Sequence, residues 1–341
     1  MSIRKLLQIA ALSALMLIVC INSGSAVQKG KALQPGDCIA IAAPASGMDD
    51  LDISLAVRKL ESWGYRVKLA PYLYAQSGYL AGSDELRAAE LNALFADDEV
   101  DAILCLRGGY GSARILDLLD YDLIAAHPKL LIGYSDITAL HTALLQKADL
   151  AVIHGPMAID ISDDGYNYTD ERLRYGLSHD KISDTGEFIL PQDWKVEVLH
   201  SGRAQGKLIG GNLAVIASLC GTPYELKADG GSILFIEEVD EDSYVIDRYM
   251  RQLWLSGLLK QVKGIVVGTL RHCEPVAQQP FDYSVRQVFE QYAAMAQVPV
   301  LYNFPVGHGP INGFLPLGVQ AEIVADGDEP KLLIPENYAA P

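Results

Sequence analysis

One serine of the chain, Ser135, stands where the nucleophile of an acyl-transfer enzyme would stand. It follows the short apolar run Leu130 to Ile132, which predicts a buried strand, and it precedes Ile137 to Lys147, which predicts a helix. A serine in such a turn lies beside the first free N–H groups of the helix. Acyl transfer needs a nucleophile on a rigid turn and backbone donors for an oxyanion. Ser135 is therefore a candidate nucleophile.

The same turn has a plainer explanation. Ser135 and Asp136 are residue types that favour helix N-caps, so both could serve only to start the helix. The segment also departs from the G-x-S-x-G elbow of α/β-hydrolases, because Ile137 occupies the position of the second glycine. The turn by itself leaves capping and catalysis both open.

A second turn, Arg107-Gly-Gly-Tyr-Gly111, is rich in glycine and follows the predicted strand Ala102–Leu106. Glycines let backbone N–H groups approach a ligand closely. A dinucleotide-binding fingerprint fits poorly, because Arg114 occupies its last glycine position. An oxyanion donor fits better, because neighbouring parallel strands end at the same edge of a sheet. The alternative is a tight turn without chemistry.

A third site joins a strand to carboxylates. The apolar run Ile233–Ile236 leads directly into Glu237, and a carboxylate at a strand end can orient a histidine. The acidic residues Asp240 to Asp242 fit a solvated loop at the start of a helix, where negative charge is favourable. Glu237 is therefore the candidate acid of this segment.

The candidate base is His308, which lies between two glycines in a proline-rich loop. The flanking glycines leave room for a reacting partner, and loops often carry catalytic residues. Two other histidines compete for the role. His141 falls on the helix after Ser135 and faces away from the turn, whereas His154 ends a predicted strand and could also line the site.

Alternating strands and helices are expected to position these residues in the first half of the chain. This alternation predicts a mostly parallel sheet with function at the carboxyl ends of its strands. The predicted strands are Cys38–Ala43, Arg66–Leu69, Ala102–Leu106, Leu130–Ile132 and Ala151–Ile153. The predicted helices are Leu51–Gly64, Ser83–Phe95 with Ser83 as N-cap, Ser112–Leu119 and Ile137–Lys147.

The length of the chain predicts two domains, because it exceeds what one hydrophobic core usually holds. We expect a nucleophile domain at 34–160, a polar linker at 161–191 with a short helix near Asp170–Leu177, and a second domain at 192–335. The strands predicted there are Glu197–His200, Ile233–Ile236, Gly264–Val267, Val300–Leu301 and Gln320–Val324, and the helices are Leu213–Leu219, Tyr244–Leu255 and Ser284–Ala294.

The N-terminus predicts export. Residues 1–26 combine a basic start, an apolar run that ends at Cys20 and small residues before a cut after Ala26, as in a secretory signal peptide. A periplasmic protein is expected in a Gram-negative host. A lipoprotein anchored through Cys20 is the alternative, although Val19 is bulky for the position before a lipidated cysteine.

The charge and the cysteines exclude several classes of partner. The formal net charge is −16, and loss of the two basic residues in 1–26 makes the mature chain more acidic still. So acidic a surface argues against nucleic acid or an anionic membrane as a partner. The four remaining cysteines show no C-x-x-C pair, so free thiols are expected, and no His/Cys cluster predicts a metal. These cysteines are Cys38, Cys105, Cys220 and Cys273.

Together, five motifs in order resemble the LD-carboxypeptidase family of serine peptidases, which includes the microcin C self-immunity peptidases. The resemblance runs from about Gln34 to Pro335. It implies a flavodoxin-like N-terminal domain with a parallel sheet, a C-terminal α/β domain with β-barrel character, an active site between them and a homodimer. The motifs are Arg107-Gly-Gly-Tyr-Gly111, Gly133-Tyr-Ser-Asp-Ile-Thr138, Gly210-Gly-Asn-Leu213, Leu234-Phe-Ile-Glu-Glu238 and Gly307-His-Gly-Pro310.

The resemblance also implies residue roles. Ser135 would be the nucleophile, Glu237 the orienting carboxylate and His308 the general base. The implied oxyanion donors are the N–H groups of Gly108 or Gly109 and of Asp136, and the residues expected to bind substrate are Arg107, Tyr110 and Asn212.

The implied activity removes terminal D-alanine from murein tetrapeptide at an L,D bond, without a cofactor. Two other functions stay open at this point. One is a serine peptidase acting on a modified peptide or a peptidyl-nucleotide, and the other is an exported solute-binding protein. The sequence leaves the third residue of the peptide and the biological role undetermined, whether wall trimming, recycling or antibiotic immunity.

Overall fold

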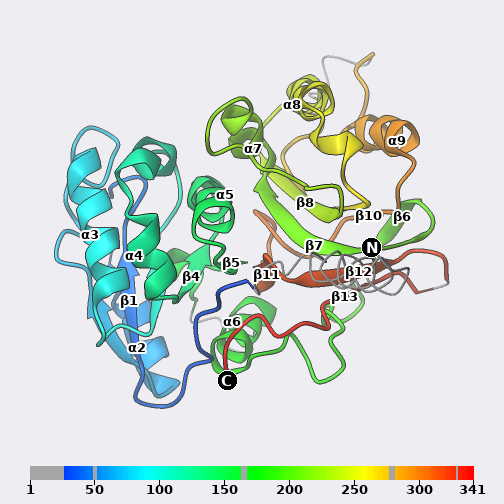
Figure 1. Ribbon diagram of the computed structural model, residues 1–341. Coiled ribbons are helices and arrows are strands. Elements are labelled where there is room, and N and C mark those ends of the chain that lie inside the picture. Colours follow the sequence, from blue (N-terminus) through cyan, green and yellow to red (C-terminus); the bar gives the residue numbers. More distant parts are fainter. Residues whose placement is uncertain (1–26, 49–51, 163–166, 276–280, 328) are drawn as a thin grey trace, which may run out of the picture.

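Two lobes lie side by side in the computed structural model, one from each half of the chain (Figure 1). The structure describes residues 27–48, 52–162, 167–275, 281–327 and 329–341. The expected signal peptide lies outside these ranges. Each lobe is built around one sheet, of six strands in the first and seven in the second.

The first sheet has the order β11-β5-β4-β3-β1-β2, and its strands β1 to β5 are parallel. All residues of β1, β3, β4 and β5 are buried, which explains why these segments read as continuous apolar runs. The strands are β1 Cys38–Ala42, β2 Arg66–Leu69, β3 Ala102–Cys105, β4 Leu130–Gly133 and β5 Val152–His154. All five predicted strands of this half are thus confirmed to within a residue or two.

Helices follow these strands as the alternation predicts. Ser83 caps α3 by accepting a hydrogen bond from the Leu86 N–H, as expected. The helix predicted from Ser112 is a 3-10 helix instead, and the short helix α4 after it was not predicted. The elements are α2 Ser54–Ser62, α3 Asp84–Ala96, η1 Ser112–Leu118, α4 Tyr121–Ala126, η2 Ser135–Ile137 and α5 Thr138–Lys147.

The second sheet is mixed and curls across its lobe (Figure 1), which confirms the barrel character of the predicted fold. Its strands β7 to β10 are parallel, and β12, β13 and β6 run antiparallel to their neighbours. The strands are β6 Glu197–His200, β7 Arg203–Asn212, β8 Ser232–Val239, β9 Gly264–Arg271, β10 Val300–Tyr302, β12 Gln320–Val324 and β13 Lys331–Leu333. Helices α7 Leu213–Leu219, α8 Ser243–Ser256 and α9 Val285–Ala296 and the 3-10 turn η4 Leu258–Lys260 complete the lobe.

Strand pairing and side-chain packing hold the two halves of the chain together. Strand β11, Leu315–Leu317, comes from the second half but pairs antiparallel with β5 of the first sheet. Helix α6, Tyr168–Ser178, lies in the segment expected as a linker, and the 3-10 turn η3 Ala158–Asp160 lies directly before that segment. Leu173 and Leu177 of α6 are buried in a core that includes Phe314. This packing fixes the halves relative to one another.

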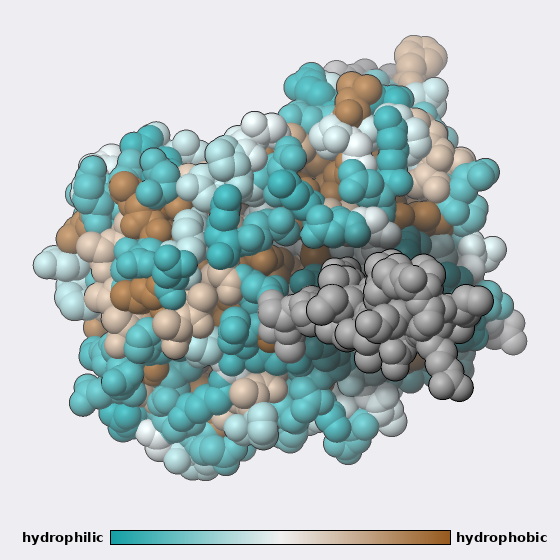
Figure 2. Space-filling view, in the orientation of Figure 1, coloured by the Kyte–Doolittle hydropathy of each residue, from teal (hydrophilic) through white to brown (hydrophobic). Residues whose placement is uncertain are grey.

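The face of the molecule seen in Figure 2 is mainly polar. Figure 2 shows a largely hydrophilic face on which hydrophobic residues form small, separate patches. In the part of the chain that the structure describes, no helix has the length and apolarity needed to cross a bilayer.

Candidate active site

Ser135 stands at a sharp turn between β4 and α5. Tyr134 is extended, whereas Ser135 has a φ of 62°, a left-handed conformation that costs a non-glycine residue about 1–2 kcal/mol. Neither Ser135 nor Asp136 caps the helix: the serine hydroxyl contacts a histidine, and the Asp136 carboxylate accepts from the Ser112 N–H at 2.8 Å. The structure therefore excludes capping as the reason for this serine, and backbone strain at such a turn is typical of functional sites.

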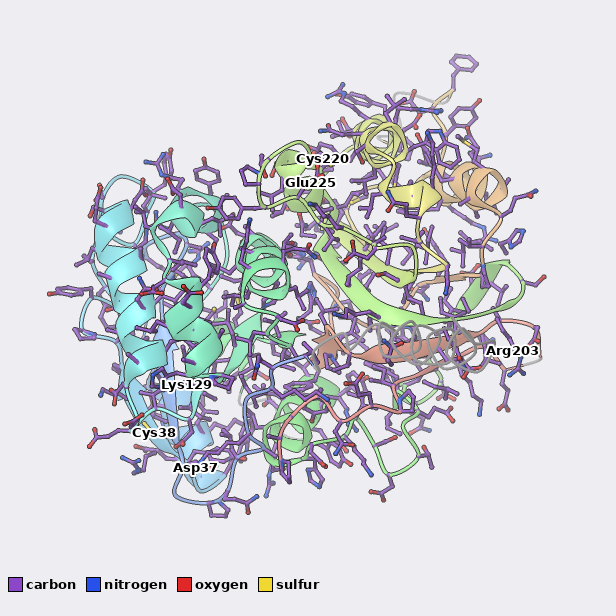
Figure 3. The ribbon with its side chains drawn as sticks, in the orientation of Figure 1. Asp37, Cys38, Lys129, Arg203, Cys220 and Glu225 are labelled. Carbon is purple, nitrogen blue, oxygen red and sulfur yellow. The ribbon has the colours of Figure 1, made fainter. Side chains whose placement is uncertain are left out.

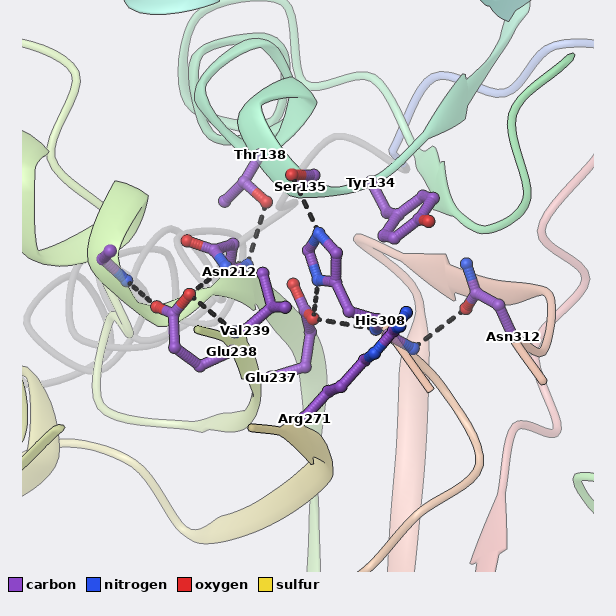
Figure 4. Close-up of polar contacts among 12 residues, drawn as sticks. Tyr134, Ser135, Thr138, Asn212, Glu237, Glu238, Val239, Arg271, His308 and Asn312 are labelled. Carbon is purple, nitrogen blue, oxygen red and sulfur yellow. Dashed lines mark hydrogen bonds and ion pairs between the residues drawn. The ribbon is translucent and has the colours of Figure 1, made fainter. Parts of the chain in front are cut away.

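Ser135, His308 and Glu237 form a continuous hydrogen-bonded row (Figure 4). The His308 ring places Nε2 at 3.0 Å from the Ser135 Oγ and Nδ1 at 2.6 Å from the Glu237 Oε2. The backbone N–H of His308 also donates to the Glu237 Oε2, at 3.2 Å. A carboxylate on Nδ1 leaves Nε2 free to accept the hydroxyl proton, which is the arrangement of a serine hydrolase triad.

The electrostatics suit a general base. Burial lowers the pKa of His308, but the charge and hydrogen bond of Glu237, together with the charges of Glu238 and Asp160, outweigh it, and the net pKa lies above the ordinary value of 6.5. Glu237 is completely buried, and its Oε1 has no hydrogen-bond partner among the described residues. The Tyr134 ring lies 4.8 Å from the His308 ring, a contact that the sequence did not point to.

Glu237 owes its place to a strand irregularity and a glycine. The predicted strand ended at Ile236, but strand β8 runs on to Val239, and its register against β9 shifts at Glu237. Such a bulge redirects a side chain. A Cβ at Gly307 would lie 2.7 Å from both the Cβ and the Oε2 of Glu237, so only glycine leaves room for the carboxylate.

The neighbouring Glu238 has a different environment. It accepts hydrogen bonds from the Asn212 side chain at 2.8 Å and from the N–H groups of Ala214 and Val239 at 2.7 and 2.9 Å. Burial first, and then the charge of Glu237, raises the pKa of Glu238 to about 7. Glu238 therefore stabilises the start of α7, while Glu237 alone reaches the histidine.

The candidate oxyanion donors converge on Ser135. A Cβ at Gly108 would lie 3.1 Å from the Ser135 Oγ and 3.4 Å from the Asp136 nitrogen, so the glycine turn faces the hydroxyl. Among the described residues, the N–H groups of Gly108 and Gly109 donate to no backbone or side-chain acceptor. These free donors are available to a substrate oxygen.

Three residues were predicted to bind substrate. Arg107 is half-buried and donates from Nε to its neighbour's carbonyl, that of Gly108, at 3.3 Å. Tyr110 is 49% exposed beside the same turn. Asn212 is buried; its Nδ2 donates to Glu238 and its Oδ1 accepts from the Val215 N–H, which caps α7. Their roles toward substrate stay predictions.

The competing histidines do not reach the serine. His141 and His154 are both fully buried, and their ring nitrogens have no hydrogen-bond partner among the described residues. Burial lowers the pKa of His141 to about 3 and that of His154 well below its ordinary value. Of the three candidates, only His308 has the geometry of a base for Ser135.

Two features of the described residues lie away from the triad. A surface hollow of about 670 Å³ lies near Arg203, at the outer end of the second lobe (Figure 3), and its lining contains none of the triad residues. The four cysteines of the described residues are unpaired, as predicted, and Cys38 and Cys220 lie in different lobes (Figure 3).

Comparison with known proteins gives a consistent result. Residues 39–155 match the LD-carboxypeptidase N-terminal domain, and residues 205–323 match the LD-carboxypeptidase C-terminal domain. The "Probable murein peptide carboxypeptidase" of Bacillus subtilis is 41% identical over 86% of this chain and 90% of its own length.

Solved structures share the fold. The crystal structure of muramoyltetrapeptide carboxypeptidase from Oxalobacter formigenes has a TM-score of 0.75 at 28% identity, over 89% of this chain and 100% of that one. Microcin C7 self immunity protein MccF, known from Escherichia coli, reaches a TM-score of 0.81 at 26% identity, over 92% and 99%. The two domain matches, together with the 41% identity, show that this chain belongs to the LD-carboxypeptidase family.

Proposed function

We propose that the protein is a serine LD-carboxypeptidase that releases terminal D-alanine from murein tetrapeptide. The observation that carries the proposal is the row from Ser135 through His308 to Glu237, with contacts of 3.0 and 2.6 Å. The names of the relatives from Bacillus subtilis and Oxalobacter formigenes support murein peptide as the substrate class. No cofactor takes part in the proposed reaction.

The mechanism follows from the geometry. His308 Nε2 takes the hydroxyl proton while the Ser135 Oγ attacks the scissile carbonyl carbon, and N–H groups of the glycine turn and Asp136 hold the oxyanion. The C–N bond then breaks, His308 returns the proton to the amino group of D-alanine, and an acyl-enzyme ester remains. Water, deprotonated by His308, attacks the ester and frees Ser135. Glu237 stabilises the imidazolium in both halves of the reaction.

The direct test supplies two substrates. The mature protein is incubated with disaccharide tetrapeptide, and free D-alanine is measured. We expect D-alanine and disaccharide tripeptide in equal amounts. An aminoacyl-sulfamoyl nucleoside serves as the second substrate, because the MccF structures include such complexes. Cleavage of the nucleoside alone would favour a microcin immunity role, and binding of tetrapeptide without cleavage would favour a solute-binding protein.

We further propose that the enzyme works in the periplasm, beside the wall. The support is the sequence of residues 1–26, with cleavage after Ala26. Fractionation and N-terminal sequencing should find a soluble protein that begins at Val27. A cytoplasmic protein that retains Met1 would contradict this placement, whereas a chain lipidated at Cys20 would still reach the wall. A homodimer, expected from the family, is tested by light scattering.

A further inference from the structure

A carboxypeptidase must recognise the free carboxylate of its substrate, and the triad does not do this. In the proposed reaction the leaving group is a single D-alanine, so its carboxylate lies only a few ångströms beyond the scissile bond. A cationic side chain near the triad would distinguish this terminus from an internal peptide bond, because charge-assisted hydrogen bonds to carboxylates are strong and directional.

We propose that Arg271 binds the terminal carboxylate of the leaving residue; this inference rests on the proposed function. Arg271 is the last residue of β9, and its register partner is Val239, two residues after Glu237. It is exposed, and Figure 4 shows its side chain extending toward the loop of His308.

The strand pattern supports this direction. Side chains two residues apart in a strand lie on the same face, so Arg271 shares a face with Thr269. A Cβ at Gly309 would lie 2.8 Å from the Thr269 side chain, which places that face against the residue after His308. Arg271 therefore projects from β9 on the side where the catalytic histidine loop packs.

The guanidinium of Arg271 is available to a ligand. In the described part of the chain it forms no ion pair, although the carboxylate of Asp240 lies next to its strand and pairs with His272 at 2.8 Å. Burial raises the pKa of the Tyr134 hydroxyl, and the positive charge of Arg271 opposes that rise. The positive charge of Arg271 therefore acts on Tyr134, whose ring contacts His308.

A second arginine, Arg107, is the other cationic side chain to consider. It belongs to the glycine turn, which holds the carbonyl oxygen in the proposed mechanism. The leaving amine must instead lie beside His308, because that ring protonates it. The leaving residue therefore lies on the side of His308 and Arg271, which assigns its carboxylate to Arg271.

The test compares two substrates that differ only in the terminal charge. One is disaccharide tetrapeptide, and the other is the same peptide ending in D-alaninamide. Wild type should have a kcat/KM for the acid that exceeds that for the amide by about 10- to 100-fold. In Arg271→Ala this ratio should fall to within a few-fold of one, mainly through KM, and Arg271→Lys should keep part of it.

The matched control is Arg248→Ala, an exposed arginine that lies over Tyr244 on α8 and should keep the wild-type ratio. Equal losses on both substrates in Arg271→Ala and Arg271→Lys would mean a structural role and would overturn the inference. A wild-type ratio of kcat/KM for the acid to that for the amide in Arg271→Ala would also overturn the inference. Failure of wild type to release D-alanine or D-alaninamide would instead overturn the proposed function, and this inference with it.

Discussion

The Oγ of Ser135 lies 3.0 Å from the Nε2 of His308, although 173 residues separate them in the chain. The serine comes from the first lobe and the histidine from the second, so the contact depends on how the lobes pack. A hydrogen bond of 2.9 Å from the Asn212 N–H to the Thr138 Oγ1 joins the two lobes close to this contact. The hydrogen-bonded row of Ser135, His308 and Glu237 therefore forms only when both lobes are folded and packed together.

Two adjacent carboxylates should differ in their effect on turnover. Glu237→Gln removes the charge that orients and stabilises the His308 ring, so kcat should fall on the order of 10³- to 10⁴-fold. Glu238→Gln keeps a polar group near Asn212 and should cost far less. Steady-state D-alanine release from both purified variants measures the ranking, and the reverse order would show that Glu238 is the acid of the triad.

The pH profile should report the raised pKa of His308. The base acts only when neutral, so kcat/KM should fall on the acidic side with a midpoint above 6.5. In Glu237→Gln, burial of the ring is opposed by fewer negative charges, so the midpoint should move to lower pH. In Glu238→Gln it should move the same way but less. An unchanged midpoint in Glu237→Gln would show that the group that titrates in the pH profile is not His308.

Much of the candidate site was predictable because its parts lie at or near the ends of apolar strand segments. Ser135, the glycine turn and Glu237 were placed by apolar runs that end in residues with chemistry, and His308 by its flanking glycines. The geometry around them was not predictable. The φ of Ser135 and the bulge at Glu237 depend on tertiary packing, and no local composition encodes them.

Gly307→Ala should disable the site through Glu237. Its methyl group would overlap the carboxylate, and a φ of +116° adds backbone strain. A displacement of about 1 Å in a catalytic group can lower the rate about 10²-fold, so kcat should fall by at least that factor. Gly221→Ala is the matched control, because its φ is +80° but nothing lies within 4 Å of the added Cβ. Equal kcat values for the two variants would rule out the steric role of Gly307.

The backbone strain at Ser135 should be measurable through its effect on the free energy of unfolding. Ser135→Gly and Ser135→Ala both lack the hydroxyl, but only glycine adopts a φ of 62° without strain. The free energy of unfolding should be about 0.5–1 kcal/mol higher for Ser135→Gly than for Ser135→Ala. In the middle of α5, Ala143→Gly should instead destabilise by about 1 kcal/mol or more. Denaturant unfolding measures all three, and a less stable Ser135→Gly would contradict the strain.

Elements that join the lobes were the least predictable part of the fold. Strand β11 is only Leu-Pro-Leu, which is too short and too proline-rich to be predicted as a strand. It forms because the edge of β5 is open to antiparallel pairing. Strand β7 contains Gly206, Gly210 and Gly211, which resemble a loop. The structure gives one reason for the last of these: a Cβ at Gly211 would lie 2.5 Å from the Thr138 hydroxyl.

The central claim is that Ser135 cleaves the bond to terminal D-alanine, and one assay tests it directly. Mature wild type and Ser135→Ala are incubated with murein tetrapeptide, and the initial rate of D-alanine release is measured at matched protein concentration. We predict release by wild type and a rate lower by on the order of 10⁴-fold or more in Ser135→Ala, which should keep the wild-type circular dichroism spectrum. Wild-type release by a folded Ser135→Ala would contradict the serine mechanism.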